Sequence, residues 1–458
     1  MNERISDKKR VVMTTIGSLG DLHPYLALAL EMRKYDIEPV IVTSAAYRAK
    51  VESLNIEFHP LRPTVPDLDT AQATEIVEKI MHPKRGAEYL FKEFLVPSVR
   101  QSYQDLQGAI RGADLFITHP LVLAGPLLAQ KTGLPWFSTV LAPTSLWSDY
   151  EPFVPPTAPW LYRVMRFGGP MAARVFKNLL EVLTKSWLGP VYEFREELGL
   201  PRGRHPLFAG QYSPQLNLAL FSRVMCQPQS DWPAQTVITG FPFYDKKDKS
   251  TIDPKLMEFL GKGPAPIVFT LGSAAIHVAG DFYRTSIEAA KILNRRAVLL
   301  VGTDNNRPKI SLPESIAVFN YAPYSELLPR AAAIVHQGGV GTTGQGLRAG
   351  IPMLVMPYNH DQPDNAARVT RLGVARTISR DSYKSNRVAR ELKELLENAN
   401  YSRRASDVGQ QVRAENGAAK AVELILNRLE RPTPNDTFEP KVFNFGVRTL
   451  GLNTGKLV

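Results

Sequence analysis

One stretch in the second half of the 458-residue chain constrains the fold more than any other. A short apolar run at residues 333–335 leads into the letters HQGGVGTTGQG, and a helical pattern continues from Thr342 to Ala349. This order of strand, glycine turn and helix directs several backbone N–H groups, and the positive end of a helix dipole, at one point. An anion such as phosphate is the natural occupant of that point. The glycines that let a ligand approach the backbone closely are Gly338, Gly339 and Gly341.

Polar side chains flank this glycine turn. His336 stands before the glycines and can donate a ring N–H to an anion, and Thr342 and Thr343 place hydroxyls in the first helical turn. A second apolar strand follows, and Asp361 and Gln362 stand just beyond its end. Because the carboxyl ends of neighbouring parallel strands meet at one edge of a sheet, where open α/β sheets bind ligands, we expect these groups to share a site. A glycine turn alone often only packs a helix closely on a sheet, but the added polar groups favour binding.

Apolar, strand-like runs alternate with helical patterns along most of the chain. The alternation is typical of parallel βαβ units, and it occurs once before residue 240 and again after residue 264. We therefore predict an α/β fold with two Rossmann-like domains that face each other across a cleft. The expected segments are a first domain (1–240), a linker rich in Lys, Asp, Pro and Gly (241–263), a second domain (264–431) and a tail of unknown structure (432–458).

Length and composition limit the class of protein and the compartment that we expect. The chain is too long for a single core, and its hydrophobic fraction of 44% is ordinary for a folded protein. A single cysteine, Cys226, excludes an internal disulfide framework and a cysteine-rich metal site. No apolar run approaches the length of a membrane span, and no signal-peptide core follows the polar first ten residues. We expect a cytoplasmic protein.

The net charge of +11 indicates a surface that attracts anions. Lys and Arg are spread along the chain without a basic recognition helix, so a sugar nucleotide or an anionic membrane explains the charge better than nucleic acid does. Residues 160–185 mix bulky apolar side chains with five basic ones. Such a helix can lie on a membrane as a peripheral contact. The favoured interpretation is a helix packed on its own domain with Arg stems at the rim.

The stretch from Tyr321-Ala-Pro through His336, Gly350-Ile-Pro and Asp361-Gln362 resembles the nucleotide-sugar signature of glycosyltransferase family 1, a GT-B group. That group includes plant secondary-product, sterol and macrolide glycosyltransferases, and the bacterial form of the signature fits best. The resemblance implies that Tyr321 stacks on the nucleobase, that His336 holds the diphosphate, and that the Asp361-Gln362 pair binds sugar hydroxyls.

Two further positions complete the expected donor site. Ser273 follows another strand, in Leu271-Gly-Ser, and is placed to touch phosphate, although Gly-Ser alone commonly marks only a turn. Plant members carry a Glu near Gln345 for the ribose, and the turn here is one residue longer, so the ribose contacts stay unassigned.

The first strand is followed by Gly17-Ser-Leu-Gly20-Asp21, which resembles the loop that carries the proposed base in bacterial glycopeptide, sterol and rhamnolipid-type transferases. Asp21 is therefore the candidate base, with Gly20 beside the nucleotide sugar. An exposed Asp with a pKa of about 4 is a weak base, so it would take the proton late. Plant enzymes have, at the position of His119, an Asp that orients their catalytic His. The resemblance therefore implies that Asp21 and His119 form a hydrogen-bonded pair in which the Asp and the His have exchanged places. The alternatives are a helix cap for Asp21 and a strand-end residue satisfied by backbone for His119.

Together these features predict a metal-independent glycosyltransferase with no cofactor. It would move a hexosyl group from a UDP- or TDP-sugar to a hydroxyl of a small or lipid-like acceptor, with inversion implied by the resemblance. Asp67-Leu-Asp69 has the form of a metal-binding Asp-x-Asp, but its proline-rich setting makes coincidence the better explanation. The alternatives are a sugar-nucleotide epimerase of the same fold and a non-catalytic accessory subunit that binds nucleotide sugars.

Overall fold

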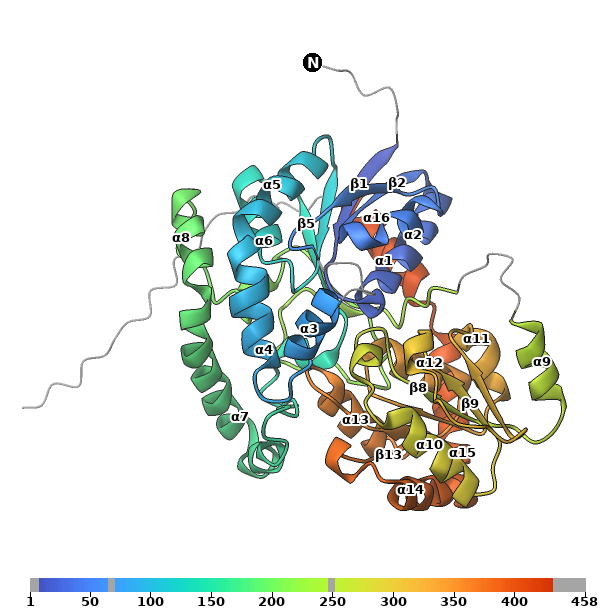
Figure 1. Ribbon diagram of the computed structural model, residues 1–458. Coiled ribbons are helices and arrows are strands. Elements are labelled where there is room, and N and C mark those ends of the chain that lie inside the picture. Colours follow the sequence, from blue (N-terminus) through green and yellow to red (C-terminus); the bar gives the residue numbers. More distant parts are fainter. Residues whose placement is uncertain (1–7, 65–70, 246–251, 431–458) are drawn as a thin grey trace, which may run out of the picture.

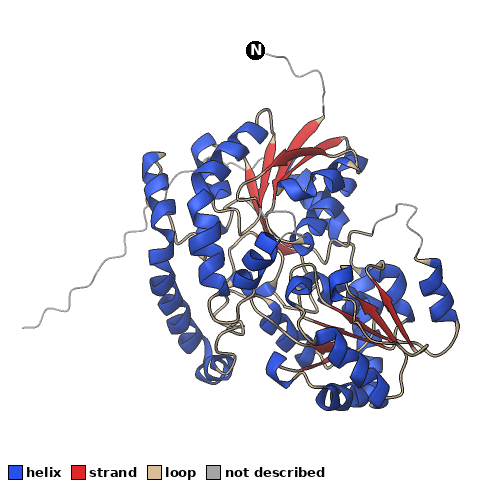
Figure 2. Cartoon of the chain, in the orientation of Figure 1, coloured by secondary structure: helices blue, strands red, loops and turns tan. Residues whose placement is uncertain are grey.

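The computed structural model describes residues 8–64, 71–245 and 252–430. It contains two parallel sheets, each covered by helices (Figures 1 and 2). The prediction of an α/β fold with two Rossmann-like domains is confirmed. Asp67-Leu-Asp69 and the tail from residue 432 lie outside the described residues.

The first sheet has seven strands in the order β3-β2-β1-β4-β5-β6-β7, and all its neighbouring pairs are parallel. From β1 the chain builds outward through β2 and β3, and then returns to the other side of β1 to form β4. The gap between the loops after β1 and β4 is therefore the place where such a sheet binds ligands. The strands are β1 (Lys9–Thr14), β2 (Ile37–Thr43), β3 (Glu57–Pro60), β4 (Leu115–Thr118), β5 (Trp136–Val140), β6 (Asn217–Ala219) and β7 (Thr236–Ile238).

The second sheet repeats this arrangement with six parallel strands in the order β10-β9-β8-β11-β12-β13. The order in which strands are added along the chain reverses between β8 and β11. The strands are β8 (Ile267–Thr270), β9 (Ala297–Leu300), β10 (Ile316–Phe319), β11 (Ala333–His336), β12 (Met353–Val355) and β13 (Ala375–Thr377). The predicted glycine turn thus follows a strand beside the reversal, which is the position that its anion-binding role requires.

Helices cover both sheets. Those of the first half are α1 (Leu19–Met32), α2 (Arg48–Glu52), α3 (Ala71–Ile80), α4 (Gly86–Glu88), α5 (Val99–Ala109), α6 (Ala124–Thr132), α7 (Leu161–Lys185) and α8 (Gly189–Glu197). Those that follow are α9 (Pro254–Gly261), α10 (Phe282–Ile292), α11 (Tyr324–Leu327), α12 (Val340–Ala349), α13 (Gln362–Arg371), α14 (Ser385–Glu397), α15 (Ala399–Ala414) and α16 (Gly417–Glu430). No helix in the described ranges combines the length and apolar character needed to cross a membrane.

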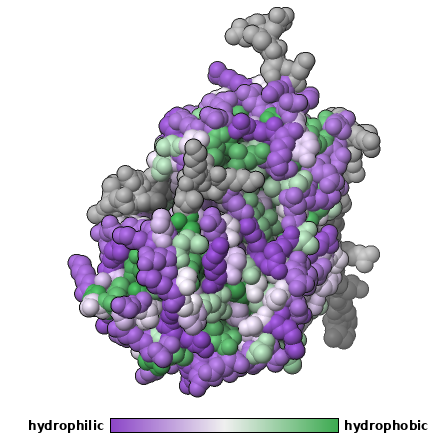
Figure 3. Space-filling model, turned by 90° about the vertical axis from the view of Figure 1, so that its right-hand side faces the viewer, coloured by the Kyte–Doolittle hydropathy of each residue, from purple (hydrophilic) through white to green (hydrophobic). Residues whose placement is uncertain are grey.

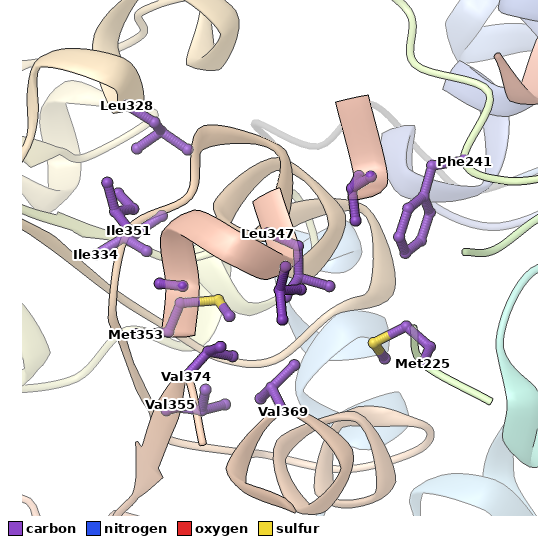
Figure 4. Packing of buried hydrophobic residues seen from close by; sticks show 14 of the residues in the cluster. Met225, Phe241, Leu328, Ile334, Leu347, Ile351, Met353, Val355, Val369 and Val374 are labelled. Carbon is purple, nitrogen blue, oxygen red and sulfur yellow. The ribbon is translucent and has the colours of Figure 1, made fainter. Parts of the chain in front are cut away.

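The two halves share parts of their cores. Met225 and Phe241, which belong to the end of the first half, join the buried cluster around Leu347 of α12 (Figure 4). Phe241 fits there because α12 has a glycine at position 344, where an added Cβ would lie 3.1 Å from the phenyl ring. The start of the segment expected to be a linker is therefore packed against α12.

The last described helix returns to the first half. Residues of α16, among them Val422 and Ile425, are fully buried in the same cluster as Met13 and Leu26. The helix lies against α1. The sequence-based division at 264–431 assigns α16 to the second half, whereas its apolar face covers the first sheet.

Candidate functional site

Asp21 lies in the first turn of α1, directly after β1. Ser18 caps this helix: its hydroxyl accepts a hydrogen bond from the Gly20 N–H at 3.2 Å, and its own N–H donates to Asp21 Oδ2 at 2.7 Å. This reciprocal pattern is a capping box, in which Ser18 rather than Asp21 is the N-cap and Asp21 is the third helical residue. Gly17, at φ +133°, makes room for it, since a Cβ there would lie 2.3 Å from Asp21 Oδ2. The other carboxylate oxygen, Oδ1, is left for a different partner.

That partner is His119, just beyond β4. Its Nε2 lies 3.6 Å from Asp21 Oδ1, which is slightly longer than a hydrogen bond. The other ring nitrogen, Nδ1, accepts the Leu121 N–H at 3.2 Å, so Nε2 is the nitrogen that carries the ring proton. Burial lowers the pKa of His119 to about 3, which keeps the ring neutral at physiological pH. His119 can therefore donate toward Asp21 but cannot accept a proton from a ligand through Nε2.

The protonation behaviour of Asp21 differs from the sequence expectation of an exposed carboxyl with an ordinary pKa. Its side chain is 29% exposed. Burial raises its pKa from 3.8 to about 6, although the hydrogen bonds from Ser18 act in the opposite direction. A carboxylate with this pKa is a better general base near neutral pH than an exposed one.

The glycine turn after β11 has the features of an anion site. His336 is fully buried, and its Nδ1 accepts the Gly338 N–H at 3.0 Å. The ring proton therefore sits on Nε2, which is buried and has no hydrogen-bond partner among the residues that the structure describes. Burial lowers the pKa of His336 to about 3, so this group is a neutral donor. A buried donor without a partner is costly unless a ligand meets it, which is what a binding site for an anion would provide.

The glycines of the turn differ in what a side chain at each position would meet. Gly338 has φ +92°, and a Cβ on it would lie 2.8 Å from Val355. A Cβ on Gly339 would lie 2.8 Å from the amide nitrogen of Gln337, whereas Gly341 faces open space. In the first turns of α12, Thr342 and Thr343 are buried, and the hydroxyl of Thr343 has no hydrogen-bond partner in the described part of the chain.

Gln337 is a residue that the sequence did not single out. Its buried side-chain carbonyl accepts the Gly272 N–H at 2.8 Å and so fastens the turn after β8 to the turn after β11. A Cβ on Gly272 would lie 2.1 Å from the Gln337 amide, which explains the glycine. Ser273 is held next to the glycine turn by this contact. Tyr321 stands farther along the same edge, after β10, with its side chain mostly exposed.

Asp361 and Gln362 begin α13 just beyond β12. Asn365 holds Asp361 by donating its amide to Oδ2 at 2.7 Å, and donates also to the Gly338 carbonyl at 2.9 Å. The Gln362 carbonyl accepts the Tyr358 N–H at 2.9 Å, which leaves its amide NH₂ as the group that can meet a ligand. Asn365 is a second residue that sequence reasoning missed, and it ties Asp361 to the glycine turn.

Residues from the two halves meet across the gap between the sheets. Helices α1 and α12 contact each other, so the loops after β1 and β11 lie on the same side. Burial raises the pKa of Asp361 to about 7, with a further contribution from the negative charge of Asp21. The contact between α1 and α12 and this effect of the Asp21 charge both indicate that the loop after β1 faces the start of α13.

A buried ion cluster fixes the position of α13 relative to the first half. Arg368 of α13 contacts Asp364 at 2.6 Å and Glu151 at 2.7 Å, and the Val154 N–H donates to Asp364 at 3.1 Å. Glu151 and Val154 come from the first half, and more than 200 residues separate them from their partners. No local pattern could have indicated this cluster. It holds the helix that presents Asp361 and Gln362.

Within residues 8–64, 71–245 and 252–430, no group of three or more His, Cys, Asp or Glu side chains is arranged to hold a metal ion. Cys226 is buried, with its thiol 3.0 Å from Glu151 Oε2.

Two protein-family models match the chain. The N-terminal domain of glycosyltransferase family 28 matches residues 11–110, and the C-terminal domain of the erythromycin biosynthesis protein CIII-like family matches residues 287–430. The O-mycaminosyltylonolide 6-deoxyallosyltransferase of Streptomyces fradiae is 30% identical over 442 residues, which are 93% of this chain and 99% of that protein. A sterol 3-beta-glucosyltransferase of Leptosphaeria maculans is 28% identical over 92% of this chain, which spans only 29% of the fungal protein.

Solved structures give the same fold. The glycotransferase of kitacinnamycin has a TM-score of 0.67 at 22% identity, with 92% of this chain and 99% of that chain covered. A spinosyn rhamnosyltransferase solved in complex with thymidine diphosphate has a TM-score of 0.64 at 15% identity, with 92% and 100% covered.

Proposed function

The chain belongs to glycosyltransferase family 1 of the GT-B fold, and from that premise we propose that it moves a hexosyl group from a UDP- or TDP-sugar to a hydroxyl of a lipophilic acceptor. The transfer needs no metal ion and inverts the anomeric carbon. The observation that carries this proposal is the buried Nε2–H of His336, which has no partner among the described residues and lies just before α12, a helix that contacts α1, where Asp21 lies. A single sugar between the halves can meet both groups.

The second half binds the donor. The neutral Nε2–H of His336 donates to the diphosphate, together with backbone N–H groups at the start of α12. These donors also stabilise the charge that develops on the diphosphate as it leaves. Tyr321 offers an exposed ring to the nucleobase. The thymidine diphosphate complex of the spinosyn rhamnosyltransferase supports a nucleoside diphosphate at this place.

The sugar itself meets the start of α13. Asp361 accepts hydrogen bonds from sugar hydroxyls, and Gln362 donates through its NH₂. Asn365 and the buried cluster of Arg368 keep these two groups in position. Orientation of this kind supplies a large part of the rate enhancement in a transfer between two bound substrates.

Asp21 is the general base. Its Oδ1 takes the proton of the acceptor hydroxyl while the hydroxyl oxygen forms a bond to the anomeric carbon. The bond from that carbon to the diphosphate oxygen breaks, and the diphosphate leaves with the electron pair. His119 remains neutral and donates toward Oδ1, so it orients the carboxylate. Attack from the side of Asp21 and departure on the side of His336 invert the anomeric carbon.

The acceptor class follows from the named relatives, which act on a macrolide intermediate and on sterols. A sterol is a bulky, largely apolar molecule with a hydroxyl. We propose an alcohol of the same character for this chain.

The test is incubation of the full chain with UDP- and TDP-hexoses and a panel of sterols, macrolide aglycones and other apolar alcohols. Nucleotide release and glycoside mass are followed together. The proposal requires a glycoside whose formation depends on both substrates. Conversion of the donor to an epimer without any acceptor would indicate an epimerase instead, and donor binding without turnover across the panel would indicate an accessory subunit.

A further inference from the structure

Helix α7 carries large hydrophobic side chains on the face that points away from the protein. Phe167 is 98% exposed and Met171 is 78% exposed. Of the fourteen large hydrophobic side chains exposed in the described part of the chain, eight lie between residues 160 and 183. We call these eight the α7 stripe: Trp160, Val164, Phe167, Met171, Val175, Leu179, Val182 and Leu183.

In the helical piece that follows Gly169, Met171, Val175, Leu179 and Val182 are three or four positions apart. This is the repeat of one helical face, so these residues lie on one side of that piece. The opposite side is the one that packs on the first half, with Met165, Ala173 and Thr184 buried. The interpretation favoured from the sequence, a helix packed on its own domain, therefore accounts for only one face of α7.

The helix is kinked beside its most exposed residue. Gly169 has φ +66° and is not helical, and Pro170 begins the second helical piece. Phe167 stands just before the kink. Helix α7 runs along the left-hand edge of the molecule (Figure 1), so the stripe is at the outside of the first half.

Elsewhere the exposed hydrophobic residues are scattered. The other five on segments away from the 150–183 region are Tyr35, Met257, Ile292, Ile310 and Tyr321. The right-hand side of the molecule is mostly hydrophilic, and its hydrophobic residues occur in separate areas (Figure 3). A concentration of exposed apolar side chains along one helix, on a protein where such residues are otherwise scattered, indicates an interaction site.

The charges on α7 indicate which partner fits. Between residues 160 and 185 there are five basic residues and one acidic residue, Glu181. Arg174 and Lys177 pair with Asp149 at 2.8 and 2.6 Å. The three basic residues of α7 that form no ion pair within the described ranges are Arg163, Arg166 and Lys185.

From this combination we propose that the α7 stripe docks on an anionic lipid bilayer. Apolar side chains enter the boundary between head groups and acyl chains, and the basic side chains meet lipid phosphates. A second copy of the chain fits less well, because a symmetric pair would bring the same basic side chains together.

The helix that carries the stripe is bonded to α13, the helix that begins at the proposed sugar-binding residues. Tyr162, at the start of α7, accepts a hydrogen bond from Arg371 of α13 at 2.9 Å. The first turn of the same helix α13 carries Gln362. Docking through α7 therefore holds the first half on a lipid surface. Apolar alcohols, the proposed acceptors, dissolve in such a surface. The docking itself is independent of the proposed sugar transfer.

The experiment is co-sedimentation of the full chain with vesicles of phosphatidylcholine alone, and with vesicles of phosphatidylcholine and phosphatidylglycerol in equal parts. We expect binding about tenfold tighter to the anionic vesicles, weakening as salt is added. The double variant Phe167→Ser/Met171→Ser should lose about tenfold in binding. Its matched control, Met257→Ser/Ile310→Ser, changes exposed apolar residues outside the stripe and should bind like the unaltered chain.

A second readout locates the contact. Trp160 should shift its fluorescence to shorter wavelength on anionic vesicles and be quenched by brominated acyl chains, and Trp160→Tyr should remove most of that signal. The triple variant Arg163→Gln/Arg166→Gln/Lys185→Gln should abolish the preference for anionic lipid.

Three results would overturn the proposal: absence of binding to anionic vesicles, equal binding by the Phe167→Ser/Met171→Ser variant, or a dimer in sedimentation velocity that this variant dissociates. The last would identify the stripe as an interface between copies of the chain.

Discussion

Replacement of Asp21 by Asn separates the two roles that the structure gives this residue. The Asn side-chain carbonyl can still accept the Ser18 N–H, so the capping box at the start of α1 is retained. The variant cannot take a proton from an acceptor hydroxyl. Loss of a general base typically lowers turnover by about 10²- to 10⁴-fold. Donor binding, which depends on the second half, should be unchanged.

The effect on stability has the opposite sign. The pKa of Asp21 rises from 3.8 to about 6 on folding. A shift of about two pKa units corresponds to about 3 kcal/mol of unfavourable free energy for the ionised carboxylate in the folded protein. Because the folded pKa is the higher one, this penalty is absent below about pH 4, grows as the pH rises to about 6, and is complete above that. Asp21→Asn should therefore be more stable than the unaltered protein at pH 8, by up to about 3 kcal/mol, and nearly equal to it at pH 4.

The assay combines steady-state transfer, calorimetry with UDP or TDP, and thermal or urea unfolding at the two pH values. Asp21→Ala is the matched variant, because it removes both the base and the acceptor of the Ser18 N–H while the Ser18 hydroxyl still accepts the Gly20 N–H, and the lost hydrogen bond should cost about 1 kcal/mol. If Asp21 were only a helix cap, Asp21→Asn would leave turnover intact and would not raise stability at pH 8. Intact turnover would refute the assignment of Asp21 as the base, and unchanged stability at pH 8 would refute the raised pKa of Asp21.

Three other outcomes are expected. His336→Ala should weaken UDP or TDP binding by about 10- to 100-fold because a hydrogen bond to a charged group is lost, whereas His336→Gln should lose less; unchanged affinity by calorimetry would contradict the role of His336. The kcat/KM for transfer should fall about tenfold per pH unit below about pH 6, where Asp21 becomes protonated, and a profile that is flat down to pH 5 would contradict the raised pKa of this base. Transfer should continue unchanged in a chelator, and a strict requirement for added Mg²⁺ or Mn²⁺ would contradict metal-independent chemistry.

The parts of the site that could be predicted from the sequence are those that depend on residues close together in the chain. His336 follows a buried strand and precedes glycines, and Asp21 follows the first strand. In parallel sheets the ends of such strands must share one edge, so their proximity to other strand-end residues follows from topology alone.

The parts that could not be predicted depend on residues far apart in the sequence. The raised pKa of Asp21 results from burial near His119, and the Gln337 contact with Gly272 joins two loops 65 residues apart. The same holds for Arg368, whose partner Glu151 is in the other half. For α7, the sequence showed an apolar helix with basic residues, but only the packing reveals which face is covered.

The central claim is that Asp21 and His336 act on opposite sides of one sugar. Its most direct test is a crystal structure of the Asp21→Asn variant with an intact UDP- or TDP-hexose, since this variant should bind the donor without consuming it. We predict diphosphate oxygens within hydrogen-bond distance of His336 Nε2, and an anomeric carbon that lies between the diphosphate and residue 21. A diphosphate bound away from His336, or a sugar with residue 21 on a separate surface, would contradict the mechanism.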